Sequence, residues 1–292
     1  MLVLQVIANG VLLGGLYACM AIGFSIVWGV MNLINLAHGS MIVLGAYITF
    51  LVTTRTGVDP FLTIPLSGAV LFAFGWLLQR YLINPIVRAS TFMTLIFTFG
   101  LDMVMVNVNL ALFTADLRSV AVPYSSWGVG LGSVSVTVPR LLVFGVAVLL
   151  TLGLDVFLNR TRLGNAIKAT SFDREAASLA GIEISRIYAL TFAIGASMAG
   201  IAGSLLAVVY PFSPVTGDTL TMKSFVVVVL GGLGSVPGAI LGGIALGTIE
   251  NLAALLLDPG YRDAIGFGLL ICVLLLRPRG LLGKPFFAEI KA

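Results

Sequence analysis

The sequence predicts an all-α integral membrane protein with about eight or nine transmembrane helices, a broken glycine-rich segment and a short cytoplasmic helix. The 292-residue chain is 59% hydrophobic and only 10% charged, whereas soluble domains are about 25% charged. Its mean hydropathy is +1.11. No Asp, Glu, Lys or Arg precedes Arg55, and a stretch of that length is sufficient for two spans of about 20 residues each.

Apolar runs give the candidate spans in order. They are Leu4–Gly29, Leu33–Val52, Phe61–Gln79, Phe92–Phe113, Leu141–Leu158, Ile187–Val209, Met222–Leu257 and Ala264–Leu276. The seventh run is too long for one crossing, and the glycines and proline of Gly231–Gly238 should break it into one short and one full-length helix. Such a break survives at bilayer depth only where protein or a water-filled cavity satisfies the freed backbone groups.

Basic residues are distributed asymmetrically along the chain. Eleven of the sixteen fall on one predicted side: Arg80, Arg88, Arg160, Arg162, Lys168, Arg174, Arg186, Arg277, Arg279, Lys284 and Lys291. This is the positive-inside pattern, so the net charge of +4 reflects membrane topology and not nucleic-acid binding. We expect a single transmembrane domain over residues 1–292, with a cytoplasmic loop at about 159–186 and the C-terminus inside. Nine crossings would place the N-terminus outside.

The longest predicted external loop covers residues 114–139. Ser119–Tyr124 and Val134–Pro139 have the pattern of two short strands around Trp127. Tyr124 and Trp127 suit the headgroup level of the membrane. We favour an interfacial anchor over a receptor-docking role for this loop.

Small residues recur at four-residue spacing, which allows close helix packing in lipid. Examples are Gly10 with Gly14, Gly195 with Ala199 and Gly203, Gly238 with Gly242, and Gly243 with Gly247. No internal sequence repeat stands out.

A short charged helix is predicted in the cytoplasmic loop, from Phe172 to Ala180. Thr170 or Ser171 is a suitable N-cap, and Asp173 and Glu175 place negative charge in the first turn. Gly181 suits the left-handed residue that ends a helix. The spacing places three residues on one apolar face: Phe172, Ala176 and Leu179. A helix this short is marginal alone, so we expect it to dock into a protein groove.

The stretch Glu175-Ala176-Ala177, followed after three residues by Gly181, resembles the coupling-helix motif of prokaryotic ABC importer permeases. The later Ile-x-Leu-Pro of that motif is absent, since Thr191 occupies the isoleucine position. Three further stretches resemble the branched-chain amino acid permease family, in its shorter permease type, and the resemblance covers nearly the whole chain. They are Gly15–Ala18 with Asn32–Gly39, Leu230–Gly243, and Arg277–Gly283.

The resemblance implies an inner-membrane subunit of a heteromeric importer for branched-chain amino acids. It implies a second related permease, two cytoplasmic ATPase subunits and a periplasmic binding protein as partners. Six residues would then couple to the ATPases: Phe172, Glu175, Ala176, Ala177, Leu179 and Gly181. The chain has no Gly-x-x-x-x-Gly-Lys-Ser/Thr motif, so ATP and its Mg²⁺ would belong to the partners and the chain is not expected to be an enzyme. Permeases for urea or short amides look similar and stay an alternative.

Polar residues inside the apolar runs are candidates for the translocation pathway, because a charge at a helix centre is costly. They are Asn35, His38, Asp102 and Glu250, together with the backbone at Gly231, Gly232 and Gly234. Interhelical hydrogen bonds or a subunit lock would explain the same residues. Four other charges, Asp155, Asp218, Lys223 and Asp258, are placed near span ends, where snorkelling suffices.

An ion-coupled secondary transporter is the main rival, with Asp102 or Glu250 as its proton or cation relay. A membrane enzyme would need a nucleophile with its base or a metal cluster. The chain has one histidine, and its two cysteines, Cys19 and Cys272, lie in apolar runs. We therefore expect neither a catalytic site nor a metal site.

Overall fold

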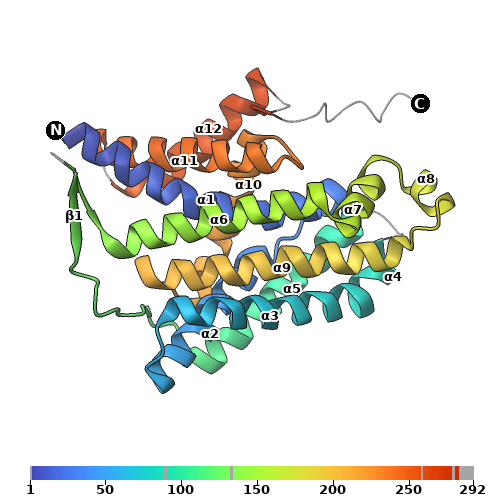
Figure 1. Cartoon of the computed structure of the whole chain (residues 1–292), viewed down its shortest axis with the longest axis horizontal. Helices are drawn as coiled ribbons and strands as arrows, with labels where there is room; N and C mark the ends of the chain where they lie inside the picture. The colour runs from blue at the N-terminus through green and yellow to red at the C-terminus, as the bar shows by residue number, and fades with distance from the viewer. Residues whose placement is uncertain (1, 88–90, 132–133, 258, 278–279, 283–292) are drawn as a thin grey trace.

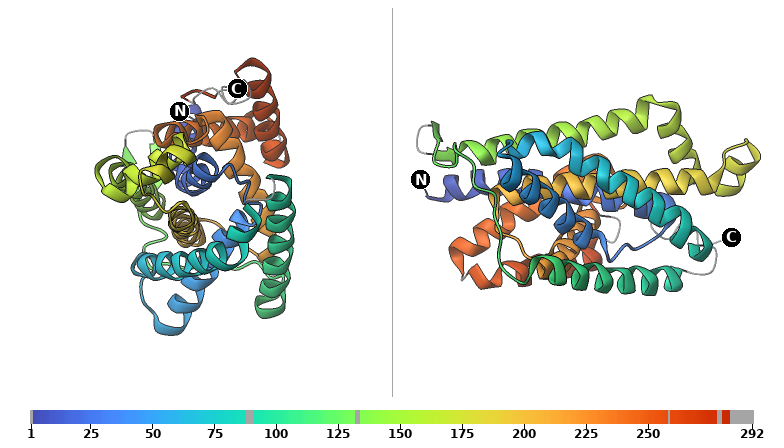
Figure 2. Two further views of the ribbon diagram at one scale, coloured as in Figure 1. Left: turned by 90° about the vertical axis from the view of Figure 1, so that its right-hand side faces the viewer. Right: turned by 90° about the horizontal axis from the view of Figure 1, so that it is seen from below.

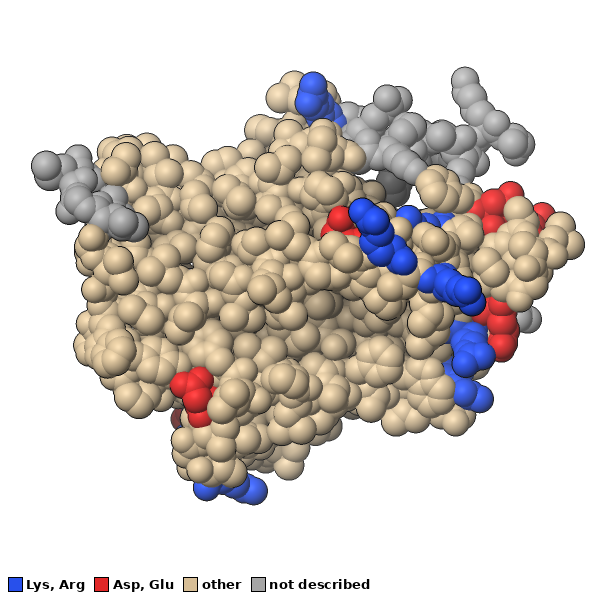
Figure 3. Space-filling model, in the orientation of Figure 1, with Lys and Arg blue, Asp and Glu red and all other residues tan. Residues whose placement is uncertain are grey.

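The computed structural model describes residues 2–87, 91–131, 134–257, 259–277 and 280–282. Its helices form an elongated bundle, with the N-terminus and the strand β1 at one end and the helices α7 and α8 at the other (Figure 1). Charged residues gather at the α7–α8 end in the face shown in Figure 3. Arg88, Asp258, Arg279, Lys284 and Lys291 lie outside the described residues.

The elements follow in chain order, and helices predominate. The first part contains α1 (Leu2–Met31), α2 (His38–Thr56), α3 (Pro60–Leu78), a π-helical turn (Gln79–Ile83), α4 (Asn84–Val87) and α5 (Thr91–Phe113). Strands β1 (Gly128–Leu131) and β2 (Val134–Thr137), then α6 (Val138–Arg160), α7 (Arg162–Phe172) and α8 (Arg174–Leu179), form the middle. The last part contains α9 (Ile184–Val209), a 3₁₀ turn η2 (Pro214–Thr216), α10 (Gly217–Gly231), α11 (Val236–Leu256), a 3₁₀ turn η3 (Pro259–Tyr261) and α12 (Arg262–Leu276).

Six helices of the described chain are long and apolar enough to cross a membrane: α1, α3 with its continuation, α5, α6, α9 and α11. The chain is therefore a multi-pass membrane protein, and the predicted eight or nine spans exceed this number. Helices α10 and α12 have 15 residues each, or about 22 Å of helix, which is shorter than a hydrocarbon core of about 30 Å. Helix α2 has 19 residues and also lies outside the six.

The predicted break in the seventh apolar run is confirmed. Helix α10 ends at Gly231 and α11 begins at Val236. Between them Gly232 has φ 103° and Gly234 has φ 74°, a region that residues with a Cβ rarely adopt. The Ser235 hydroxyl caps α11 by accepting from the Gly238 amide at 3.1 Å.

Two sets of four helices follow the same plan in opposite directions through the bundle. In each set a long helix (α1 or α9) leads through an irregular segment to a helix that begins inside the bundle (α2 or α10). A helix with proline in its first turn follows (α3 or α11), and then a helix on the periphery (α5 or α12). In the left view of Figure 2, α5 and α12 lie on the same side of the bundle. The structure thus contains an inverted repeat that the sequence does not reveal.

Glycine packing follows the same symmetry. On α1, Gly10 and Gly14 contact the backbone of α11 at Thr248 and Ile244, so these helices run antiparallel. The matching pair is α3 with α9, where Gly75 contacts Ala196. The two long helices α1 and α9 cross at Gly23 and Gly195. The predicted small-residue faces therefore form the closest helix contacts.

The interior ends of α2 and α10 meet. A Cβ on Gly39 would overlap the carbonyl oxygen of Gly217, so the two first turns are in backbone contact. The Gly39 amide donates to the Thr221 hydroxyl at 2.8 Å, and that hydroxyl donates to the Leu36 carbonyl at 3.1 Å. These hydrogen bonds satisfy backbone groups that two interrupted helices would otherwise leave unpaired.

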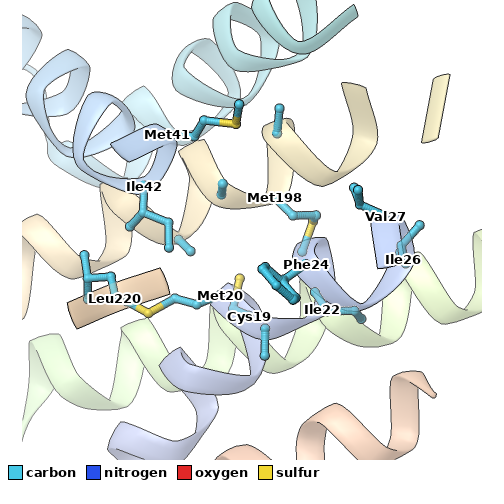
Figure 4. Close-up of a cluster of buried hydrophobic side chains, with 14 of the residues drawn as sticks. Cys19, Met20, Ile22, Phe24, Ile26, Val27, Met41, Ile42, Met198 and Leu220 are labelled. Carbon is cyan, nitrogen blue, oxygen red and sulfur yellow. The ribbon is translucent and has the colours of Figure 1, made fainter. Parts of the chain in front are cut away.

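The apolar core surrounds this junction. Figure 4 shows side chains of α1, α2, α9 and α10 packed together, with Met20 near Leu220 and Met198 near Phe24. Phe24 is 2% exposed and Met41 is fully buried. This part of the core is therefore built from α1 and α9 and from α2 and α10, which are the equivalent helices of the two sets.

The external loop differs in part from its prediction. Strand β2 lies where a strand was expected, but its antiparallel partner β1 starts at Gly128, not at Ser119. The segment near Ser119 pairs elsewhere, because the Arg118 amide donates to the Phe212 carbonyl at 2.8 Å and the Val120 amide to the Ala207 carbonyl at 3.0 Å. The Ala207 carbonyl in the last turn of α9 and the Phe212 backbone just after this helix thus pair with this segment.

Candidate functional site

The predicted cytoplasmic helix is divided in two. Helix α7 ends at Phe172, and α8 begins at Arg174, so a single helix from Phe172 to Ala180 is wrong. Asp173 is the N-cap, not Thr170 or Ser171, and its Oδ1 accepts from the amides of Glu175 and Ala176, both at 2.9 Å. A carboxylate satisfies these two donors better than a hydroxyl and also complements the helix dipole.

The C-terminal stop of α8 is confirmed at Gly181, which has φ 84°. The Ile182 amide donates to the Ala177 carbonyl, and the Gly181 amide to the Ser178 carbonyl, both at 3.0 Å. This pair of bonds is the Schellman motif. A six-residue helix that is capped at both ends is thereby held in shape without a long helical run.

The faces of α8 differ from the predicted apolar face. Ala177 is 5% exposed and packs inward, and the Arg174 guanidinium lies 5.7 Å from the centre of the Tyr188 ring on α9. Leu179 is 91% exposed and Phe172 is 65% exposed. Ala176 and Glu175 are also exposed. Helix α8 therefore contacts α9 through Arg174 and Tyr188, buries Ala177 and exposes Leu179, and it projects at the end of the bundle (Figure 1).

Asn35 and His38 both lie at the interior start of α2 and are buried, at 2% and 1% exposed. His38 Nε2 is 2.9 Å from the Met20 carbonyl oxygen, and the Phe24 ring packs edge-on against the imidazole at 5.5 Å. The Asn35 amide nitrogen lies 3.8 Å from Met41 Sδ, and its Oδ1 has no hydrogen-bond partner in the described chain. His38 thus links the start of α2 to α1, whereas Asn35 is buried in the turn before α2 with one polar atom unpaired.

Asp102 is on α5 and is 7% exposed. Its Oδ1 accepts from the Ser40 hydroxyl at 2.5 Å, which ties the peripheral α5 to the first turn of α2. The carboxylate of Asp218, in the first turn of α10, lies beside it. Asp102 therefore belongs to the junction of the two interior helix ends.

Glu250 on α11 has different partners. It is 2% exposed, and its carboxylate accepts from the Tyr17 hydroxyl at 2.7 Å and from Lys223 Nζ at 3.0 and 3.1 Å. Lys223 Nζ also contacts the Tyr17 hydroxyl at 3.1 Å. Placing Lys223 at a span end, free to snorkel, was wrong, because its ammonium is the partner of a buried carboxylate. Sequence spacing gave no signal for a contact between residues 27 positions apart.

A second carboxylate completes this ion cluster. Asp263 in the first turn of α12 has its Oδ1 3.0 Å from Lys223 Nζ. A crevice between α10, α11 and α12 surrounds the cluster. It is lined by Thr219, Lys223, Val226, Leu246, Glu250, Asp263, Gly266 and Phe267.

The predicted glycine break is covered by Leu281 and Leu282. The Leu281 amide donates to the Leu230 carbonyl at 2.8 Å, and the Leu282 amide to the Gly231 carbonyl at 3.0 Å. Gly231 itself is in backbone contact with Gly238. The backbone groups at Gly231, Gly232 and Gly234 are thus largely engaged within the protein, as a break at membrane depth requires.

A polar contact ties the predicted external loop to the start of α3. The Tyr124 hydroxyl donates to the carboxylate of Asp59, the N-cap of α3, at 2.7 Å. Burial, together with this carboxylate, raises the pKa of Tyr124 well above its usual range. Trp127 is 66% exposed, which suits an anchor at the membrane surface.

Known proteins resemble this chain over nearly its whole length. The family described as "Branched-chain amino acid transport system / permease component" matches residues 6–274. The high-affinity branched-chain amino acid transport system permease protein LivH of Salmonella typhimurium is 38% identical, covering 97% of this chain and 96% of the relative. BraD of Pseudomonas aeruginosa, a permease protein of the same description, is 35% identical over 97% and 96%.

A second type of permease is also related. LivM of Salmonella typhimurium is 26% identical over 91% of this chain and 68% of the relative. No solved structure matches. The chain belongs to the family of permease components of branched-chain amino acid transport systems.

Proposed function

We propose that this chain is the inner-membrane permease subunit of an ABC importer and forms part of the pathway for branched-chain amino acids. The likeness to LivH and BraD supports the substrate class, since both relatives carry that description. The single observation that carries the coupling role is α8. This helix is capped at both ends, buries Ala177 and exposes Leu179.

The proposed assembly has a second permease, two cytoplasmic ATPase subunits and a periplasmic binding protein. LivM-like chains are suitable partners because they share the permease sequence pattern. ATP and Mg²⁺ would be used by the ATPases, and this chain would bind no cofactor. Nine helices would enter the membrane, with α2, α10 and α12 added to the six long ones, which places the N-terminus outside and α8 in the cytoplasm.

Coupling through α8 follows from its shape. The exposed Leu179 and the small Ala176 can insert into a groove, while Glu175 and Arg174 contact its polar rim. Because the helix is too short to hold its shape by length, the Asp173 cap and the Gly181 stop must keep it rigid. Movement of the ATPases would then reach α9 through the contact of Arg174 with Tyr188.

Two substitutions in α8 test this role. Glu175→Lys puts positive charge at a helix N-terminus, and Gly181→Val forces a β-branched residue into a left-handed conformation at a cost of about 1–3 kcal/mol. We expect both to abolish ATP-driven leucine uptake in proteoliposomes that contain the whole transporter. Assembly with the second permease, measured by co-purification, should persist.

Gly153→Val is the matched control, because a Cβ at this helical glycine of α6 meets open space. It should leave uptake intact. Normal uptake by both α8 variants would remove the coupling assignment. If the unaltered transporter took up urea but not leucine, the substrate class would be urea or short amides instead of branched-chain amino acids. If an ion gradient drove flux without the ATPases, the protein would be a secondary transporter and not an ABC permease.

A further inference from the structure

The ion cluster of Lys223, Glu250 and Asp263 lies toward the end of α11 that leads into α12. Glu250 is six residues before Leu256, the end of α11, which corresponds to about 9 Å along the helix. Helix α11 is long enough to span the hydrocarbon layer. Charged groups at such a depth are expensive unless they meet one another, water or another protein.

The three charges are not equally buried. The side chains of Glu250, Lys223 and Asp263 are 2%, 16% and 54% exposed. Glu250 keeps partners on both sides, because the Tyr17 hydroxyl and the Lys223 ammonium reach it. Asp263 has half of its side chain at the open side of the crevice. Asp263 stands in the first turn of α12, directly after the turn η3, so its exposed half can reach water at the end of the helix, and this side of the crevice is open.

A single ammonium serves both carboxylates. Lys223 Nζ is 3.0 Å from Glu250 Oε1 and 3.0 Å from Asp263 Oδ1. If Asp263 releases the lysine, Lys223 still keeps Glu250 and the Tyr17 hydroxyl. The outer ion pair can therefore open without leaving a buried charge alone, whereas opening the inner pair would strand Glu250.

The walls of the crevice are apolar. Val226, Leu246 and Phe267 line it beside the charges, and Gly266 leaves room because a Cβ there would only reach ordinary contact distance, 3.5 Å from Glu250 Oε1. The crevice thus combines one cation, one accessible anion and an apolar wall, which are the groups that an aliphatic amino acid contacts. Its volume is only about 10 Å³, so the Lys223–Asp263 pair must open before a substrate can enter.

We propose that the Lys223–Asp263 pair is a binding site for zwitterionic aliphatic amino acids on the transport path. The substrate ammonium takes the place of Lys223 on Asp263, and the substrate carboxylate takes the place of Asp263 on Lys223. Asp263 then has an ammonium of its own, while Lys223 pairs with both Glu250 and the substrate carboxylate, and the branched side chain lies against Val226, Leu246 and Phe267. This proposal rests on the proposed function and assigns the site within it. A neutral amide could not make the exchange.

The proposed binding site is tested by asking whether a substrate protects a thiol, introduced into the crevice, from chemical modification. Cys272 on α12 is exposed, so it is first changed to Ser, and Gly266→Cys then places one thiol among the lining residues. The assembled transporter, with its ATPases and second permease, is treated with a small methanethiosulfonate reagent. We expect saturating L-leucine to slow modification by roughly tenfold, because only the empty crevice reacts. Isoamylamine and 4-methylpentanoate, which each lack one charged group, should not protect.

Variants of Asp263 identify the partner of the ammonium. Asp263→Asn should abolish protection by leucine, and Asp263→Glu should retain it. Asp116→Asn is the matched control, since Asp116 also pairs with a basic residue, Arg118 at 3.3 Å, but lies in the external loop. It should leave protection unchanged. Gel filtration of each variant shows that the complex is assembled.

The outcomes separate this inference from the proposed function. Two results would contradict the binding site but not the importer function. One is ATP-driven leucine uptake without protection of the thiol at position 266, and the other is protection that persists in Asp263→Asn. A thiol at that position that never reacts also contradicts the binding site, because the crevice would then be closed to solutes. Absence of leucine uptake by the unaltered transporter would instead contradict the proposed function.

Discussion

The two halves of the repeat share a backbone path but differ in the polar chemistry that joins their helices. Buried hydroxyl groups link α2 and α3 of the N-terminal half to the long helix α9. Thr49 Oγ1 donates to Ser204 Oγ at 2.8 Å, Thr63 Oγ1 donates to Thr49 Oγ1 at 2.9 Å, and Ser67 Oγ lies 2.5 Å from Ser204 Oγ. The corresponding helices α10 and α11 of the C-terminal half are linked to the long helix α1 by Lys223, Glu250 and the Tyr17 hydroxyl.

This difference separates what the fold requires from what it allows. Both halves need glycine at the closest helix contacts, because the backbones touch there, as at Gly14 on Ile244 and Gly45 on Gly200. Neither half needs a particular polar group between its helices. Hydroxyl pairs give a fixed and neutral link, whereas the ion cluster provides charges that a substrate can exchange. The comparison therefore points to the C-terminal half as the chemically active one.

The largest effect is expected from Lys223→Met. It leaves the buried Glu250 without its counter-charge, and losing one member of a buried ion pair costs about 3–5 kcal/mol. The thermal unfolding midpoint of the purified protein in detergent should fall strongly. The double variant Lys223→Met/Glu250→Leu should recover most of that loss, because an apolar replacement of a whole buried pair is often neutral. A double variant as unstable as the single one would contradict the ion-pair assignment.

A smaller effect is expected where the two interior helix ends meet. Alanine at Gly39 would push its methyl group into the Gly217 carbonyl, but alanine at Gly217 would meet its nearest atom, the Ser40 nitrogen, at 3.1 Å. Overpacking of this kind costs about 1–3 kcal/mol. Gly39→Ala should therefore lower the unfolding midpoint clearly more than Gly217→Ala. Equal losses would show that the junction adapts symmetrically.

The smallest effect is expected from the hydroxyl links. Ser204→Ala removes the partner shared by Thr49 and Ser67, and interhelical hydrogen bonds in membranes contribute about 0.6 kcal/mol on average. The unfolding midpoint should shift only slightly, and leucine uptake should stay normal. Loss of uptake in an otherwise stable Ser204→Ala protein would mean that the N-terminal half also takes part in the transport chemistry.

Much of the fold could be predicted from local sequence. Gly181 and the glycines after α10 were predictable because only backbone conformation matters at these positions. The N-cap of α8 was misplaced because Thr170, Ser171 and Asp173 can all cap a helix, and α7 already uses the first two within its own turns. The strand near Ser119 was misplaced because its competing partners, Phe212 and Ala207, are distant in sequence.

Among the candidate pathway residues, sequence identified polar groups inside apolar runs but not their partners. Glu250 was found because a carboxylate in such a run is costly. Lys223 was misjudged because hydropathy cannot distinguish an ammonium that reaches the membrane surface from one that meets a carboxylate. Asp263 carried no signal at all, since it stands near the start of an apolar run where a charge is ordinary.

The sequence by itself determined that this protein lies in the membrane, which side is basic, where the glycine-rich break falls and which family the chain resembles. These features depend on composition and on the conformations open to single residues. Only the tertiary structure decided that two sets of four helices are inverted copies, that α2 and α10 meet inside the bundle, and that Lys223 joins Glu250 to Asp263. The physical reason is that ion pairs and backbone contacts between distant helices depend on distances in space, which local sequence does not encode.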